Sequence, residues 1–182
     1  TAYLLSLYEQ TLCYESSPSV RNQFLIARPL GIFVGGSVNA VRSVRGKQVS
    51  DVVQILLFLQ AFVANPEAFI EYIKRLLNPD DGIKNSHGYS LFANSFTLIK
   101  DKMRLGKEEE YARETYLKVL STIFHSQVPN ARLHIDKQRG GDEEIGLRIG
   151  NADYFGVINV GDSSKLISLC EENGLLCETK EF

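Results

Sequence analysis

The chain has few cysteines, no long apolar run and almost no net charge, and each shortage excludes a class of protein. Its three cysteines, Cys13, Cys170 and Cys177, lie at unrelated spacings, which fits neither a disulfide framework nor a zinc site and favours reduced thiols in a cytoplasmic protein. The longest apolar run, at 55–59, is too short to span a bilayer, and no secretory leader opens the chain. The net charge of -2 provides no global positive field, so any contact with nucleic acid depends on a local patch.

The remaining composition is that of an ordinary globular protein. Hydrophobic residues make up 44% and charged residues 23% of the 182 residues, enough for one domain or for one domain with a sizeable insertion. The chain begins at Thr1 rather than at a methionine, and its last residues, 178–182, have the pattern of a structural element rather than of a tail. We therefore expect a piece of a longer protein.

Apolar periodicity and turn residues predict the elements. Helices are expected over 1–16, 52–64, 66–77, 91–103, 107–124 and 163–173, and strands over 30–34, 133–135, 145–149, 155–160 and 175–179. Ser50 is expected to cap the apolar helix at 52–64, and Gly174 to end the last helix. The glycine-containing turn at 139–142 predicts a β-hairpin, and apolar residues on both faces of 155–160 suit a buried strand of the kind found in parallel sheets.

This order of elements predicts an α/β fold in which two flanking pieces build one sheet and the middle is an insertion. The expected divisions are a leading helix and linker at 1–28, the start of the sheet at 29–65, a helical insertion with a β-hairpin at 66–150, and the continuation of the sheet at 151–182. A mostly helical domain with a separate small sheet is the competing layout.

The segment RPLGIFVGGSVNAVR at 28–42 carries the most distinctive chemistry. Here a predicted strand ends in glycines that let a backbone approach a phosphate, followed by polar side chains that can donate to it. A basic run follows, without an acid before Asp51. The candidate nucleic-acid contacts are Gly35, Gly36, Ser37, Asn39, Arg42, Arg45 and Lys47. The alternative is a solvated loop in which the glycines only make a turn.

Other patterns fall short of a catalytic or metal site. The Gly46-Lys47-Gln48 triplet lacks the hydroxyl and the preceding glycine of a phosphate loop, and Asp142-Glu143-Glu144 follows a turn rather than the apolar strand of a helicase Asp-Glu box. Asp80 and the Glu178/Lys180 pair resemble parts of a metal-dependent nuclease site but lie far apart in the sequence.

Neither the histidines nor the predicted hairpin tip indicates a catalytic or metal site. His87, His125 and His134 have no partner at metal-ligand spacing, and His134 is expected on the polar face of its strand. The tip at 137–139 is basic, and exposed tips of this kind are commonly just polar. We therefore predict no catalytic residue and no metal site in this chain.

Two stretches together resemble a known family. They are PLGIFVGGSVNAV at 29–41 followed by SDVV at 50–53, and EIGLRIG at 144–150 followed by FGVINVGD at 155–162, with Lys165-Leu166 and Leu169-Cys170 beyond. Both are similar to the Res subunits of type III restriction systems, which are DEAD/DEAH-box helicases of superfamily 2. The resemblance covers most of the chain, from Pro29 to Phe182, and depends on the order and separation of the motifs.

The resemblance implies an internal fragment of an ATP-dependent DNA translocase with two RecA-like lobes. The chain would hold the opening of the second lobe and a helical insertion. ATP, Mg²⁺ and the arginine finger would be bound or supplied by other parts of the parent protein, so the fragment would have no cofactor and no activity of its own. The implied partners are DNA, held weakly by the fragment alone, the remaining helicase lobe, a nuclease domain where the family has one, and a methyltransferase subunit. No membrane is implied.

A second interpretation belongs to a different class. The chain could be a stand-alone, non-enzymatic domain that binds nucleic acid or protein, with the helical middle as its docking surface. An intact short gene would favour that interpretation, whereas flanking helicase motifs would favour the translocase.

Overall fold

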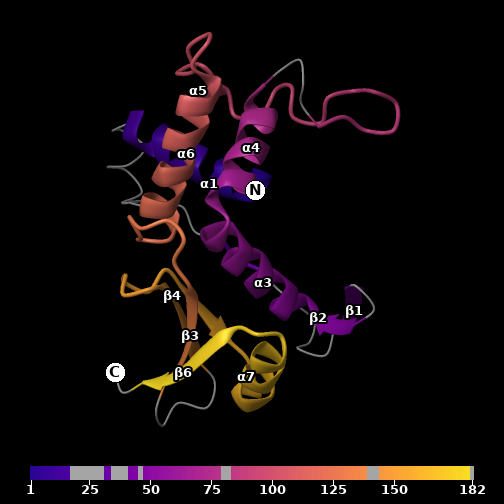
Figure 1. Ribbon diagram of the computed structural model, residues 1–182, viewed down its shortest axis with the longest axis vertical. Helices are drawn as coiled ribbons and strands as arrows, with labels where there is room; N and C mark the ends of the chain where they lie inside the picture. Colours follow the sequence, from indigo (N-terminus) through magenta and orange to yellow (C-terminus); the bar gives the residue numbers. More distant parts are fainter. Residues whose placement is uncertain (17–30, 34–40, 45–46, 79–82, 139–143, 181–182) are drawn as a thin grey trace. The chain divides into compact units, whose positions relative to one another are not determined.

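The structure is a computed structural model that describes residues 1–16, 31–33, 41–44, 47–78, 83–138 and 144–180, with the backbone alone for 41–44, 47–48 and Gln138. These residues form a mixed α/β chain with two compact units, each of which is described by itself (Figure 1). The first unit comprises Thr1–Ile32 and Pro66–Ile123, and the second comprises Phe33–Asn65 and Phe124–Phe182. The predicted α/β class is confirmed in this general sense.

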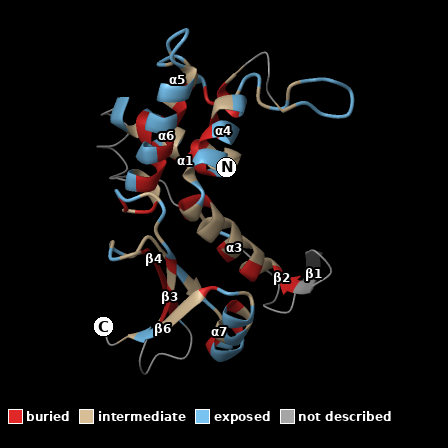
Figure 2. Ribbon diagram, viewed as in Figure 1, coloured by how far each residue is buried: buried red, intermediate tan, exposed pale blue. Residues whose placement is uncertain are grey.

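The first unit is helical. Its helices are α1 (Ala2–Ser16), α4 (Pro66–Leu77), α5 (Thr97–Lys100) and α6 (Glu108–Ile123). Helix α4 packs against α6, and each buries one apolar stripe, as Figure 2 shows in red. The buried side chains of these two helices are Ile70, Ile73, Leu76, Leu77, Ala112, Thr115, Tyr116, Val119 and Leu120. Their spacing of three and four residues is the amphipathic pattern that predicted both helices.

The second unit contains the sheet. Its elements are β1 (Val41–Val44), β2 (Lys47–Ser50), α3 (Asp51–Ala64), β3 (Leu133–Gln138), β4 (Glu144–Ile149), β5 (Gly156–Asn159), α7 (Ser163–Glu172) and β6 (Leu176–Lys180). Strands β3 to β6 form one sheet in the order β5-β4-β3-β6, in which β6 pairs parallel to β3 and the other pairs are antiparallel. Strands β1 and β2 form a separate antiparallel hairpin.

One face of the four-stranded sheet is apolar. Because side chains alternate along a strand, Leu133 and Ile135 of β3 lie on the same face as Ile145, Leu147 and Ile149 of β4, and all five are buried. Helix α7 packs against β6, and α3 packs against both α7 and β3. The predicted hairpin at 133–149 is therefore the centre of the sheet rather than an appendage of the helical middle.

Local signals in the sequence explain how several elements begin and end. The Ser50 hydroxyl accepts a hydrogen bond from the Val53 amide at 3.2 Å, which caps α3 as expected. The Asp162 carboxylate accepts from the Lys165 amide at 2.9 Å and caps α7. Gly174 has φ +78°, a left-handed conformation that a side chain would strain, and it lies just beyond the end of α7.

Three expected elements differ from the structure. The helix predicted at 91–103 shrinks to α5, because Phe96 adopts φ 60° and the Lys100 ammonium group donates to the carbonyls of Phe92 and Ala93, which closes a compact loop. The strand predicted at 30–34 is absent from its described part, 31–33. Strand β5 is an antiparallel edge strand, and Val157 is 65% exposed; its register through Gly146 places it on the same face of the sheet as Asp136, opposite the apolar face.

Among the described residues, no single helix is long and apolar enough to cross a membrane. Helices α3 and α4, which are separated by a break at Asn65, meet the length and composition criterion only when they are taken together as a broken pair.

Candidate functional site

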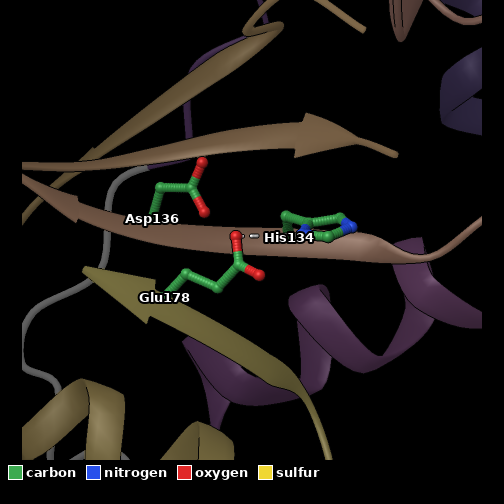
Figure 3. A group of neighbouring side chains, drawn as sticks. All are labelled: His134, Asp136 and Glu178. Carbon is green, nitrogen blue, oxygen red and sulfur yellow. Dashed lines mark ion pairs between the residues drawn. The ribbon is translucent and has the colours of Figure 1, made fainter. Parts of the chain in front are cut away.

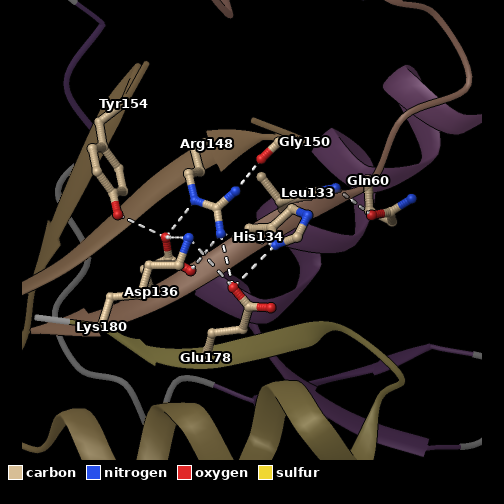
Figure 4. Close-up of polar contacts among 9 residues, drawn as sticks. All are labelled: Gln60, Leu133, His134, Asp136, Arg148, Gly150, Tyr154, Glu178 and Lys180. Carbon is tan, nitrogen blue, oxygen red and sulfur yellow. Dashed lines mark hydrogen bonds and ion pairs between the residues drawn. The ribbon is translucent and has the colours of Figure 1, made fainter. Parts of the chain in front are cut away.

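The second face of the sheet carries a cluster of charged side chains, which we call the polar cluster: His134, Asp136, Arg148, Tyr154, Glu178 and Lys180 (Figure 4). Strand alternation brings these residues to one face. His134 and Asp136 are two residues apart on β3, and Glu178 and Lys180 are two residues apart on β6. The antiparallel register of β4 places Arg148 directly opposite His134.

Two carboxylates face each other across the β3–β6 pair. The parallel register pairs Asp136 with Glu178, an arrangement of like charges that would destabilise the sheet by itself. The Arg148 guanidinium lies between them: its Nε donates to Asp136 Oδ2 at 2.5 Å and its Nη2 donates to Glu178 Oε2 at 2.8 Å. Its Nη1 donates to the Gly150 carbonyl. Arg148 therefore bridges the two carboxylates and offsets part of their charge.

Asp136 is the most deeply buried charge of the cluster, with no exposed side-chain surface. Burial, the strongest influence on its pKa, favours the neutral form. The hydrogen bonds from Arg148 and Tyr154, together with the charges of Arg148 and Lys180, outweigh burial and lower the pKa of Asp136 below its ordinary value. Asp136 is thus an ionised carboxylate in the interior, held in that state by its cationic neighbour.

A glycine makes room for the aromatic member of the cluster. Gly146 lies opposite Asp136 in the β3–β4 register, and a Cβ atom built on it would lie 2.6 Å from Tyr154 Cε1. The bare backbone at Gly146 lets the Tyr154 ring lie flat against β4 and donate its hydroxyl to Asp136 Oδ2 at 2.7 Å. Gly146 is therefore a packing requirement of the polar cluster.

The ligand atoms of His134, Asp136 and Glu178 all lie within 4.8 Å of one another, a spacing that could hold a metal ion (Figure 3). The Arg148 guanidinium, however, is bonded to both carboxylates and its Nη2 also lies 3.1 Å from His134 Nδ1. Lys180 Nζ lies 3.6 Å from Glu178 and 3.8 Å from Asp136. Two cations already balance the two carboxylates, so a divalent ion would have to displace Arg148. The arrangement is that of an ion-pair network rather than of a metal centre.

The structure describes only part of the site predicted from the sequence. Gly35, Gly36, Ser37, Asn39 and Arg45 lie outside the described residues. The backbones of Arg42 and Lys47 lie on the two strands of the β1–β2 hairpin, where the register pairs Arg42 with Val49 and Lys47 with Val44. Arg42 and Lys47 thus belong to one short hairpin that leads directly into α3, not to a loop after a parallel strand.

The polar cluster was missed because its partners come from separate parts of the sequence. Asp80, which is too far from Glu178 and Lys180 in the sequence to support a nuclease site, lies outside the described residues. Asp136 is their partner instead. The signal that could have found it is the pairing of polar residues two apart, at 134 and 136 and again at 178 and 180, which would have extended the predicted strands by one residue each. At the predicted hairpin tip, Lys137 is described, and its Nζ donates to the Ser164 hydroxyl at 3.0 Å.

In the helical unit, a hollow of about 380 Å³ lies on α1 and α6. Its lining includes Glu15 and Glu114 as well as Lys102 and Lys118. Burial, with smaller effects from nearby groups that include both glutamates, raises the pKa of Tyr8 to about 12, so this phenol remains neutral. Because two acidic and two basic side chains line the hollow, its charge favours neither anions nor cations.

Comparisons with protein-family models, with curated proteins and with solved structures found no match for this chain. The sequence motifs and the geometry of the described residues are therefore the observations that bear on function.

Proposed function

We propose that this chain is a non-catalytic part of an ATP-dependent DNA translocase similar to the Res subunit of type III restriction systems, and that the β1–β2 hairpin contacts the DNA backbone. The motifs at 29–41 and 144–162 support the family. The observation that carries the DNA contact is the position of the basic run. Arg42 and Lys47 lie on paired strands, with Arg45 between them in the sequence.

A compact basic hairpin suits contact with phosphates. Most protein–DNA hydrogen bonds go to phosphate and sugar, and they hold a protein on the duplex without reading its sequence. Ser50 ends β2 and also caps α3, so the hairpin is joined without a linker to a helix that packs on the sheet. Because the net charge of the chain is -2, binding depends on this local patch and should be weak.

The described residues do not support catalysis by the chain itself. The charged cluster on the sheet is internally neutralised by Arg148 and Lys180. In the sequence, the Gly46-Lys47-Gln48 triplet is also an incomplete phosphate loop, because Gln48 stands where the loop has its hydroxyl residue. These residues do not fit ATP with Mg²⁺, so we assign ATP hydrolysis to other parts of the parent protein and derive no step from this chain.

Fluorescence anisotropy with a labelled DNA duplex tests the DNA contact. The affinity of the wild-type chain is measured over a series of salt concentrations and compared with that of the triple variant Arg42→Ala, Arg45→Ala, Lys47→Ala. Each lost phosphate contact should reduce the slope of log K against log[salt] by about 0.9 for duplex DNA. We expect the triple variant to bind more weakly on every duplex sequence and to show a slope flatter by up to about 3.

A matched variant separates the hairpin from net charge. Lys102, Arg104 and Lys118 are exposed residues of the helical unit, and replacing all three with alanine changes the net charge by the same amount. This control should bind DNA as the wild type does. Equal losses in the two triple variants would show a non-specific charge effect, and an unchanged affinity and slope in the hairpin variant would refute the hairpin contact.

The family assignment has its own test, which is the gene sequence on both sides of the region that codes for this chain. The proposal requires a phosphate loop and an Asp-Glu box upstream and an arginine-containing helicase motif downstream. A start codon directly before Thr1 and a stop codon after Phe182 would instead support a stand-alone interaction domain.

A further inference from the structure

Two of the three cysteines meet where α7 returns to the sheet. Cys170 lies on α7 and is fully buried, whereas Cys177 lies on β6 and is partly exposed. The end of α7 brings them together: Gly174 turns the chain, and the Leu175 amide donates to the carbonyl of Cys170 at 3.0 Å. Strand β6 then packs against α7, and the Cys177 thiol donates to the carbonyl of Ile167, one turn before Cys170 on α7, at 3.9 Å. This contact holds Cys177 against the part of α7 that carries Cys170, and the two thiols interact by a hydrogen bond.

This arrangement gives the two sulfurs different chemical roles. The hydrogen bond from Cys170 lowers the pKa of the Cys177 thiol, while the same bond and burial raise the pKa of Cys170. The thiolate is the reactive form of cysteine, and Cys177 is also the more exposed of the two residues. Cys177 is therefore placed to react first, with the sulfur of Cys170 in contact with it.

We propose that Cys170 and Cys177 form a modification site, a dithiol that a hydroperoxide oxidises to an intramolecular disulfide between α7 and β6. The inference does not depend on the proposed DNA contact. The Cys177 thiolate attacks one oxygen of the hydroperoxide, the O–O bond breaks, and the other oxygen leaves as an alcohol after taking a proton. This step leaves a sulfenic acid on Cys177.

The Cys170 sulfur then attacks the Cys177 sulfur. The S–O bond breaks, the S–S bond forms, and the departing hydroxide takes the Cys170 proton to give water. Overall, two thiols are oxidised to one disulfide, and the hydroperoxide is reduced to an alcohol and water. The new bond would fix α7 to the strand that carries Glu178 and Lys180 of the polar cluster.

The test uses the full chain with Cys13→Ser, so that Cys170 and Cys177 are the only cysteines. The folded protein is treated with hydrogen peroxide, and thiols and intact mass are then measured. We expect both thiols to be lost together, the mass of the monomer to fall by two hydrogens, and dithiothreitol to restore both. Persistence of both thiols, oxidation to sulfinic acid without a disulfide, or disulfides formed only between molecules would overturn the proposal.

Two further variants in the same background assign the roles. With Cys170→Ser, Cys177 should stop at a sulfenic acid that dimedone traps, and with Cys177→Ser, the buried Cys170 should keep its thiol under the same treatment. Oxidation of Cys170 in the second variant at the rate of the pair would contradict the assignment. Circular dichroism checks that each variant is folded, and the mass result for the Cys13→Ser protein decides the proposal even if a variant fails to fold.

Discussion

Each of the two units contains an arginine that donates hydrogen bonds from two nitrogens to one carboxylate. The two ion pairs differ mainly in burial. In the helical unit, Arg113 donates to both oxygens of Glu67 at 2.8 and 2.7 Å, and the two side chains are 46% and 73% exposed. In the sheet unit, Arg148 donates to both oxygens of Asp136 at 2.5 and 3.4 Å, and the two side chains are 6% and 0% exposed. Judged by hydrogen-bond lengths alone, the exposed pair would be at least as strong as the buried one.

Exposure to solvent decides which of the two ion pairs contributes to the stability of the protein. Water and salt screen an exposed ion pair, and holding two long side chains in one geometry costs entropy, so such pairs commonly contribute little. A buried pair has given up its hydration, and losing one partner leaves the other charge unpaired in a medium that cannot solvate it. The polar cluster should therefore control the stability of the sheet, while the surface pair of the helical unit should not.

The largest effect is expected from Arg148→Met. This change leaves Asp136 buried without its main cation and facing Glu178, and it should destabilise the protein by about 3–5 kcal/mol. Urea unfolding followed by circular dichroism measures the loss. The double variant Asp136→Leu, Arg148→Met should recover most of it, because it removes the charges together, and a double variant as unstable as the single one would contradict the account.

Acid should weaken the same pair. The folded-state pKa of Asp136 is lowered from its ordinary value of 3.8, so the carboxylate stabilises the folded state fully above that value. The contribution shrinks as the pH falls from 3.8 towards the lower folded pKa, where the folded state also takes up the proton. Unfolding free energies measured across this window should fall less steeply in Asp136→Leu, Arg148→Met than in the wild type, and parallel curves would exclude Asp136 as the source.

A moderate effect is expected from Gly146→Ala. The added methyl group would overlap the Tyr154 ring, so the ring must move and its hydrogen bond to Asp136 must lengthen. Overpacking of this kind costs about 1–3 kcal/mol. Adding Tyr154→Ser should make the alanine tolerable, and an equal cost of Gly146→Ala in both backgrounds would show that the ring is not the cause.

The smallest effect is expected from Arg113→Met in the helical unit. The pair with Glu67 is exposed, so the urea midpoint should not move measurably despite the two short hydrogen bonds. The same experiment in low and high salt sharpens the comparison with the buried pair. A midpoint shift as large as that of Arg148→Met would show that burial is not what separates the two units.

The sequence predicted the elements whose signals are local. Helices α3, α4, α6 and α7 were expected within a few residues of their bounds, because apolar spacing and capping residues act inside a single element. The β1–β2 hairpin was missed, because the sequence around Lys47 was considered only as a basic run and as part of a phosphate loop, whereas Val44 pairs with Lys47 in the structure. The edge position of β5 was also missed, because an apolar sequence does not say which neighbours cover a strand.

The polar cluster and the thiol pair could not be derived from local patterns. Asp136 meets Glu178 only because β6 pairs in parallel with β3 after α7 crosses the sheet, and a shift of one residue would move Glu178 to the opposite face. Cys170 and Cys177 likewise meet only through the packing of α7 on β6. The basic run was found from the sequence, and the structure adds that Arg42 and Lys47 belong to one hairpin.

The most direct test asks whether the β1–β2 hairpin or the polar cluster binds DNA. Anisotropy titrations over a range of salt would compare the wild type with the triple variant Arg42→Ala, Arg45→Ala, Lys47→Ala and with Lys180→Ala, which removes the partly exposed cation of the polar cluster. Our account predicts weaker binding and a flatter salt slope for the triple variant and a wild-type slope for Lys180→Ala. A wild-type slope for the triple variant, with the loss in Lys180→Ala instead, would contradict it.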